Sequence, residues 1–120
     1  MAMILAVDDS MSMLEMVTFT LKAAGHQVMS AADGVDALAK AEKSNVDLVL
    51  TDVNMPNMDG ISLVQALRAS ERHRFTPILI LTTESTQEKK LQGKSAGATG
   101  WIVKPFEPDS LLKTIDKVLS

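Results

Sequence analysis

The sequence predicts an α/β fold in which helices cover both faces of a parallel sheet, a doubly wound arrangement. Five short runs of strand-favouring residues alternate with longer segments of helical periodicity, which is typical of repeated βαβ units. The first, third and fourth runs are predominantly apolar, as expected of strands that are buried on both faces. The five runs are Met3–Val7, Val28–Ala31, Val46–Thr51, Pro77–Thr82 and Thr99–Val103.

Length and composition bound the class of protein. A chain of 120 residues, 46% apolar and 22% charged, has the size and balance of one globular domain, so residues 1–120 are expected to form a single unit. The chain has no cysteine, which excludes disulfides, thiolate metal sites and cysteine nucleophiles. We therefore expect any metal to be bound through oxygen.

Charge and the N-terminal segment restrict the partners. The net charge is −3, and no basic stripe with interleaved aromatic residues is present, so nucleic acid is not an expected partner. The apolar stretch Met1–Val7 is ended by Asp8 and Asp9, which leaves it too short to cross a membrane, and it lacks the features of a secretory signal. We expect a cytoplasmic monomer without membrane contact.

The first two helices follow the first two strands. One is predicted from about Ser10 to Ala24, with Ser10 or Asp9 as its cap and Gly25 at the position where a left-handed residue commonly ends a helix. The second helix is predicted to begin near Gly34. Their apolar stripes are Met13, Leu14, Val17 and Leu21 on the first, and Val35, Leu38 and Ala41 on the second.

The third and last helices carry clear apolar stripes. The third is predicted to start at Asp59–Gly60, with Asp59 as its cap, and to fade into the polar stretch 70–74. In the last helix, Pro108 suits the first turn and Glu107 lies near the cap. The stripes are Leu63, Val64 and Leu67 on the third, and Leu111, Leu112, Ile115, Val118 and Leu119 on the last.

The fourth helix is predicted to be weaker than the others. Ser85 and Glu88 match a capping box, but Leu91 is the only large apolar residue that follows, and Gly93 lies inside the helix. A glycine there costs roughly 1 kcal/mol relative to alanine. We expect this helix to be the most loosely held and the easiest to shift.

Polar residues follow four of the apolar runs. In an open parallel sheet, ligands bind outside the carboxyl ends of the strands, so polar side chains at these ends should meet at one edge. The residues are Asp8 with Asp9, Asp52, Thr82 and Lys104.

Three carboxylates at one place predict a site for a hard cation. Mg²⁺ accepts one or two carboxylates, keeps several waters and completes its shell with phosphate oxygens. Lys104 would pair with a carboxylate or a phosphoryl oxygen, and Thr82 would donate a hydroxyl hydrogen bond. This set of groups suits phosphoryl transfer, with Asp52 as the carboxylate nucleophile.

The motifs around these residues resemble those of the receiver domains of two-component response regulators, in particular the CheY-like regulators that consist of this domain alone. The resemblance spans essentially the whole chain. Each motif is weak when taken singly, but the set in this order is highly specific. The motifs are Val7–Ser10, Thr51–Pro56 with Met58–Gly60, Leu81–Thr82, Ala96–Ala98 and Lys104–Phe106.

This resemblance implies a five-stranded sheet in the order 2-1-3-4-5 with five helices, as in flavodoxin-like and CheY-like proteins. Asp52 would accept a phosphoryl group from a histidine kinase, and Lys104 and Thr82 would hold the phosphoryl oxygens. A cis Lys104–Pro105 peptide bond is also implied. The implied Mg²⁺ ligands are Asp8, Asp9, Asp52 and the main-chain carbonyl of Asn54.

One position departs from the commonest family pattern. Thr82 and an aromatic residue, usually Tyr or Phe, form the family's switch, and Trp101 stands at the aromatic position. A larger ring needs a larger space, so we expect Trp101 to rotate less completely. Asn54 and Glu84 resemble residues of the fast-decaying chemotaxis regulators, which predicts a short-lived phosphoryl group.

Several other residues have more ordinary interpretations. His26 and His73 have no ligand residues nearby and are expected at the surface or in turns. The eight methionines are expected mainly to fill the core. A group of lysines forms either a solvated face or a docking surface for an acidic partner, namely Lys89, Lys90, Lys94, Lys113 and Lys117.

The sequence therefore predicts a phosphorylation-controlled binding module and not an enzyme. Phosphorylation of Asp52 would alter the face made by the fourth helix, the last strand and the last helix. By resemblance, the partners are a sensor or chemotaxis histidine kinase, a flagellar motor switch protein or another downstream protein, and a phosphatase. A role as a phosphate sink or phosphorelay intermediate in another two-component pathway stays open.

Two other classes fit the sequence less well. An aspartyl phosphatase that uses Asp8 would be expected to carry an acid two residues later, where Ser10 stands. A flavin-binding protein of the same topology would need an uncharged, hydroxyl-rich loop after the first strand. Asp8 and Asp9 would instead repel a phosphate unless a metal lay between them.

Overall fold

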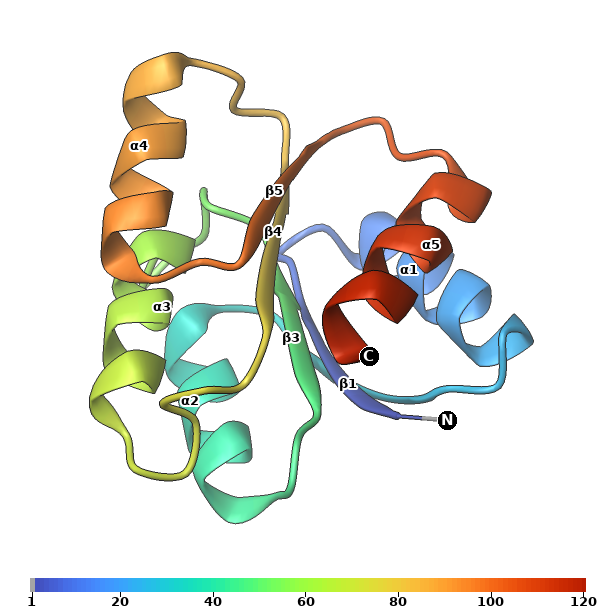
Figure 1. The fold of residues 1–120 in the computed structure, drawn as a ribbon, viewed down its shortest axis with the longest axis horizontal. Helices are drawn as coiled ribbons and strands as arrows, with labels where there is room; N and C mark the ends of the chain where they lie inside the picture. Colours follow the sequence, from blue (N-terminus) through green and yellow to red (C-terminus); the bar gives the residue numbers. More distant parts are fainter. Residues whose placement is uncertain (1) are drawn as a thin grey trace.

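The computed structural model describes residues 2–120 and shows a five-stranded parallel sheet with helices on both faces (Figure 1). The strand order β2-β1-β3-β4-β5 confirms the predicted doubly wound fold. The strands are β1 (Met3–Val7), β2 (Gln27–Ala31), β3 (Leu48–Thr51), β4 (Ile78–Thr82) and β5 (Gly100–Val103).

The helices divide between the two faces of the sheet. Figure 1 shows α1 and α5 on one side and α2, α3 and α4 on the other. Because all the strands are parallel, their carboxyl ends lie at one edge, the upper edge in Figure 1. The helices are α1 (Met11–Ala23), α2 (Gly34–Lys43), α3 (Gly60–Ala69), α4 (Gln87–Ala96) and α5 (Pro108–Leu119).

The core forms one apolar layer on each face of the sheet. Every residue of β3 and β4 is buried, whereas β2 and β5 at the sheet edges are partly exposed. Leu63 and Leu67 of α3 belong to one layer, and Leu111 and Ile115 of α5 belong to the other. Burying a side chain of this size contributes about 1.5–3 kcal/mol to the free energy of folding. The central strands are therefore stably packed, and the residues at their carboxyl ends are held in fixed positions.

Polar caps determine where the helices begin. Ser10, Asp33, Asp59 and Glu107 each accept a hydrogen bond from the backbone N–H three residues later, which satisfies a donor in the first turn. The predicted caps of α1, α3 and α5 are thereby confirmed. Gly25 follows α1 with φ of 94°, as its predicted place at the helix end requires.

The start of α4 differs from the prediction. Thr86 caps the helix, not Ser85, and its hydroxyl accepts from the Lys89 N–H at 3.3 Å. Glu88 is then the second residue of the helix, whereas a capping box requires an acid at the third. The predicted capping box is therefore wrong by one position.

Two expectations about helix burial were also wrong. Val35 is 52% exposed, whereas the predicted Leu38 and Ala41 do pack on the core, together with Ala37. Leu91 is 53% exposed, and Gly93 is the buried residue of α4. In α4 the residue against the sheet is a glycine because a Cβ there would lie 2.7 Å from Trp101 and 3.2 Å from Ile80.

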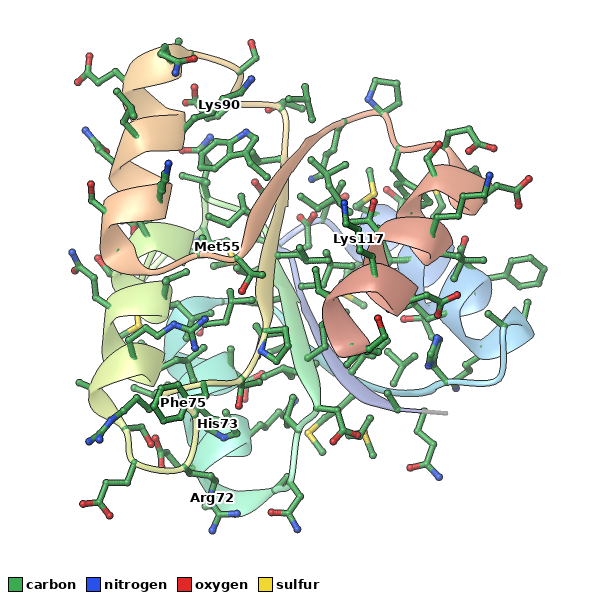
Figure 2. The ribbon with its side chains drawn as sticks, viewed as in Figure 1. Met55, Arg72, His73, Phe75, Lys90 and Lys117 are labelled. Carbon is green, nitrogen blue, oxygen red and sulfur yellow. The ribbon has the colours of Figure 1, made fainter. Side chains whose placement is uncertain are left out.

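His73 lies in a turn, one of the two places predicted for it, but its side chain is buried rather than at the surface. Only 1% of it is exposed, and its Nε2 and Nδ1 lie 2.6 Å from the Ala41 carbonyl and 3.1 Å from the Thr76 hydroxyl. The ring therefore ties the end of α2 to the loop before β4. Figure 2 shows His73 near Arg72 and Phe75, at the end of the sheet opposite the strand carboxyl ends.

Candidate functional site

Asp8 and Asp52 lie next to each other because their strands are neighbours. β1 pairs with β3, with Val7 opposite Thr51, and the Asp52 N–H donates to the Val7 carbonyl at 3.0 Å. Each aspartate directly follows its strand. The register of the sheet therefore brings two carboxylates to the same edge.

Lys104 joins these two carboxylates. Its Nζ donates to Asp8 Oδ2 at 2.7 Å and to Asp52 Oδ2 at 3.0 Å, and all three side chains are largely buried. Burial lowers the pKa of Lys104, but the hydrogen bonds and charges of the two aspartates outweigh this effect and raise the pKa above its usual value. The ammonium group is therefore charged at neutral pH.

Backbone N–H groups hold the other oxygen of each aspartate. Asp52 Oδ1 accepts from the Val53 N–H at 2.6 Å, and Asp8 Oδ1 accepts from the Ser10 N–H at 2.9 Å. Each carboxylate is thus held at both oxygens, by one backbone donor and by Lys104. Such charge-assisted hydrogen bonds are about twice as strong as neutral ones, and they fix the orientation of both groups.

Thr82 ends β4, the strand on the other side of β3 from β1. Its hydroxyl oxygen accepts a hydrogen bond from the Glu84 N–H at 3.2 Å, so the hydroxyl proton remains available to a further acceptor. The Thr82 carbonyl accepts from the Lys104 N–H at 2.8 Å. This bond continues the pairing of β4 with β5, and the next peptide bond, Lys104–Pro105, is cis, as the resemblance implied.

Gly60 makes room for the chain at Asp52, a role that sequence reasoning missed. Its N–H donates to the Val53 carbonyl at 2.8 Å. A Cβ at this position would lie 2.0 Å from the Asp52 carbonyl oxygen, a distance that no side chain tolerates. The sequence signal was present as a glycine directly after a helix cap, but it was interpreted only as a helix start.

The loop between β3 and α3 is tied to the start of α2, which sequence reasoning also missed. Asn57, with φ of 68°, donates from Nδ2 to Asp33 Oδ2 at 2.7 Å, and the Gly34 N–H donates to the Met58 carbonyl at 3.1 Å. The backbone hydrogen bond from Asp36 and the bond from Asn57 lower the pKa of Asp33. These contacts restrain the loop that follows Asp52.

Three carboxylates are placed so that they can share one cation. Asp8, Asp9 and Asp52 each offer an oxygen within 4.8 Å of the others. Ligands at the Mg²⁺ distance of about 2.0–2.1 Å in an octahedron are about 3–4 Å apart, so these carboxylates could hold the ion after a small adjustment of their side chains. Asp9 is exposed, which leaves space for water ligands. Asn54, whose carbonyl is the further expected ligand, is exposed in the loop two residues after Asp52.

Trp101 is half-buried on β5 and is connected to the loop after β4. Its indole N–H donates to the Glu84 carbonyl at 3.0 Å. The N–H of the same Glu84 donates to the Thr82 hydroxyl. One residue, Glu84, therefore links the aromatic ring to the site.

Of the remaining candidates, His26 lies at the opposite end of the sheet from the site, and two methionines lie in the loop that follows Asp52. His26 accepts a hydrogen bond from the Ala2 N–H at 3.2 Å, at the amino-terminal end of β1. Met55 and Met58 are half-buried and pack against the core layer under α3.

Among the helices of residues 2–120, none is both long and apolar enough to cross a bilayer.

The sequence matches one protein family and several curated proteins. The response regulator receiver domain family matches residues 4–116. Protein PilH of Pseudomonas aeruginosa is 38% identical over the whole chain and 99% of its own length. Chemotaxis protein CheY-3 of Vibrio cholerae is 39% identical over 96% of this chain and 89% of its own.

Solved structures of similar proteins have the same fold. The chemotaxis response regulator CheY4 of Vibrio cholerae is 56% identical, with a TM-score of 0.95 over 99% of both chains. The receiver domain of a sensor histidine kinase from Pseudomonas aeruginosa is 30% identical, with a TM-score of 0.92 over 98% of this chain and 97% of its own. That receiver domain holds a magnesium ion coordinated in its active-site cleft.

Proposed function

The chain belongs to the family of two-component response regulator receiver domains, and we propose that its signal is Mg²⁺-dependent phosphorylation of Asp52 by a histidine kinase. One observation carries the proposal: Lys104 Nζ contacts Asp8 at 2.7 Å and Asp52 at 3.0 Å. This contact orients the Asp52 carboxylate beside the Lys104 ammonium group, and the carboxylates of Asp8 and Asp9 lie close by. Phosphoryl transfer depends mainly on such positioning and charge neutralisation.

In the proposed reaction, an Asp52 carboxylate oxygen attacks the phosphorus of a phosphohistidine. The O–P bond forms as the P–N bond breaks, and the imidazole leaves with the electron pair. The Val53 N–H and Lys104 orient the carboxylate before the attack. After transfer, Lys104 and the Thr82 hydroxyl are the donors for the phosphoryl oxygens.

The proposed Mg²⁺ ligands are the three clustered carboxylates and one main-chain carbonyl. When bound, the ion neutralises charge on the phosphoryl oxygens. Asp9 is exposed and Asp8 is held by a backbone N–H, so one ligand is free to adjust and the other is preset. The proposed ligands are Asp8, Asp9, Asp52 and the carbonyl of Asn54.

We propose that the protein is a phosphoryl-accepting regulator rather than an enzyme that acts on a separate substrate. The phosphoryl group is gained and lost on its own Asp52. Asn54 is exposed and Glu84 is half-buried, each two residues beyond a residue of the site. Both can contact an entering water, which supports a short-lived phosphoryl group, with removal aided by a phosphatase.

The proposed output surface is the face formed by α4, β5 and α5. The hydrogen bonds from Thr82 through Glu84 to Trp101 connect it to the site. Figure 2 shows Lys90 on α4 and Lys117 on α5, with β5 between these helices. A downstream protein with an acidic segment suits the positive charge of this face.

Chemotaxis-type control of a flagellar motor switch protein is the favoured pathway, in the cytoplasm. The supporting observation is the similarity to CheY-3, at 39% identity, and to the chemotaxis regulator CheY4, at 56% identity over nearly the full length of both chains. The second candidate is a phosphate-sink or relay role in another two-component pathway. The chain is about as similar to protein PilH, at 38% identity over its whole length, as to CheY-3, so the similarity to CheY-3 does not by itself select the chemotaxis pathway.

The deciding experiment compares binding of the receiver-binding segment of a flagellar motor switch protein with and without beryllofluoride, a phosphoryl mimic, in Mg²⁺ buffer. We expect tighter binding with the mimic and no such gain in Asp52→Asn. Asp47→Asn is the matched control, because Asp47 is an exposed aspartate at the other end of the sheet. This variant should respond like the original protein.

Equal binding with and without the mimic would contradict the motor assignment. If Mg²⁺-dependent phosphorylation of Asp52 by a small phosphodonor is still intact, the sink or relay role becomes the better proposal. If Asp52 does not become phosphorylated, the proposed function itself is wrong.

A further inference from the structure

The ring of Trp101 lies directly against the backbone of α4 at Gly93. A Cβ added at Gly93 would lie 2.7 Å from Cζ3 and 3.0 Å from Cε3 of the indole ring, and 3.2 Å from Cδ1 of Ile80. Real Cβ atoms do not approach other atoms to 2.7 Å. The recess between Gly93 and Ile80, the Trp101 slot, therefore exists because residue 93 has no side chain.

The polar edge of the ring is fixed as well. The indole N–H donates to the Glu84 carbonyl at 3.0 Å, and the Glu84 N–H donates to the Thr82 hydroxyl at 3.2 Å. The ring is thus held by the slot on its six-membered side and by a hydrogen bond at its nitrogen. Its position is set jointly by α4 and by the loop that borders the site.

Few other apolar contacts fasten α4 to the sheet. Gly93 is the buried residue of the helix, and Leu91 is exposed. Gly93 lowers the stability of an isolated helix by roughly 1 kcal/mol relative to alanine. The seating of Trp101 compensates for this loss, because the ring is large and buries much apolar surface. Residues 93 and 101 therefore depend on each other.

We propose that Gly93 is a positioning residue that keeps Trp101 in the Trp101 slot both before and after Asp52 is phosphorylated. Movement of the Thr82 hydroxyl then reaches the α4 face by displacing Glu84 and the start of α4, without rotation of the ring. The outer side of the ring, with Lys90 and Lys94, lines a groove between α4 and β5. This groove stays open in both states. The part of this inference that concerns the phosphorylated state rests on the proposed function.

The test uses the fluorescence of Trp101, the single tryptophan of the chain. Emission wavelength and acrylamide quenching are measured for the original protein and for Gly93→Ala. Because Trp101 is half-buried, we expect intermediate emission wavelength and quenching in the original protein, and a red shift with stronger quenching in Gly93→Ala. Ser95→Ala, on the exposed side of the same helix, should behave like the original protein. Unchanged quenching in Gly93→Ala would overturn the proposal.

A stability cycle provides a second readout. In the original protein, Gly93→Ala should lower the urea midpoint, because the added methyl group displaces the ring. In a Trp101→Phe background, the same substitution should raise the midpoint, because the smaller ring leaves room and alanine favours the helix. If Gly93→Ala acted only through a general structural effect, it would change the urea midpoint in the same direction in both backgrounds. That result would contradict the proposal.

The phosphorylated state is tested by adding Mg²⁺ and beryllofluoride. Loading of the site is followed independently by fluorine NMR, with Asp52→Asn as the unloaded control. We expect acrylamide quenching of Trp101 to remain unchanged once the site is loaded. A rise in quenching with loading intact would overturn the inference and leave the proposed function standing. Absence of loading would contradict the proposed function, and Gly93→Ala without beryllofluoride would then decide the inference alone.

Discussion

The Lys104 ammonium nitrogen lies 3.0 Å from Oδ2 of Asp52, although 52 residues separate them in the chain. The contact arises because β3 and β5 both pair with β4. It is largely buried, and breaking a buried ion pair on one side leaves a charge without its partner. We therefore expect this contact to stabilise the fold in addition to its proposed role at the site.

Removing the lysine charge should destabilise the protein unless a cation replaces it. We expect Lys104→Met to lower the free energy of unfolding by about 1–3 kcal/mol without divalent ions, less than for a fully buried pair because solvent screens the site. Mg²⁺ should recover part of the loss, since it neutralises the same carboxylates. Urea unfolding with EDTA and with Mg²⁺ measures both effects.

Lys113→Met serves as the control for this prediction. Lys113 lies exposed on α5, so its loss should change the free energy of unfolding by less than about 0.5 kcal/mol. An equal loss in both variants would show that the ion pairs of Lys104 do not stabilise the fold.

Asp9 should contribute to Mg²⁺ affinity without contributing to stability. The residue is exposed, and it completes the cluster with Asp8 and Asp52. We expect Asp9→Asn to weaken Mg²⁺ binding by about tenfold or more, equivalent to ~1.4 kcal/mol, because one charged ligand is lost. Calorimetric titration with Mg²⁺ measures the affinity, and thermal unfolding in EDTA should show an unchanged midpoint.

Gly60→Ala should disturb the loop that carries Asp52. The added methyl group would meet the Asp52 carbonyl oxygen at 2.0 Å, so the start of α3 must move. We expect a loss of about 1–3 kcal/mol in stability, the usual cost of overpacking, together with slower phosphorylation by a small phosphodonor. Ser62→Ala, an exposed position in the same helix, should be close to neutral. Normal phosphorylation of Gly60→Ala would refute the steric argument.

Asp33 should make stability depend on acid pH. Its backbone hydrogen bond with Asp36 and its bond with Asn57 favour the ionised carboxylate and lower its pKa from 3.8. Its contribution is therefore present above the unfolded-state pKa and is lost as the pH falls through the lower folded-state pKa. The stability difference between the original protein and Asp33→Asn should shrink as urea midpoints are measured at decreasing pH below 3.8. A difference that stays constant with pH would contradict this account.

The site could be predicted from the sequence because its residues stand at strand ends. Asp8, Asp52, Thr82 and Lys104 each follow or close an apolar run, and in a parallel sheet all such ends share an edge. The burial of the central strands was predicted from their apolar runs, and the strand order was implied by the family resemblance. The caps Ser10, Asp59 and Glu107 were predictable for a similar reason, since a cap depends on residues within one helical turn.

Other features depend on which segments of the backbone lie close together in the folded protein. Local sequence patterns do not contain that information. The burial of His73 requires the end of α2 to lie within hydrogen-bonding distance, and the need for Gly60 arises from a carbonyl eight residues earlier. Val35 and Leu91 were expected in the core, yet both are exposed. In α4 the buried residue is Gly93, which lies against the ring of Trp101.

The sequence by itself determined the α/β class, the strand ends and the identity of the groups that meet there, because apolar periodicity and parallel topology are properties of the chain. Only the tertiary structure decided how those groups are held. The two contacts of Lys104, the tie between Asn57 and Asp33, and the fit of Trp101 against Gly93 all join separate elements. Such contacts depend on differences of a few tenths of an ångström in packing, which residue spacing along the chain does not specify.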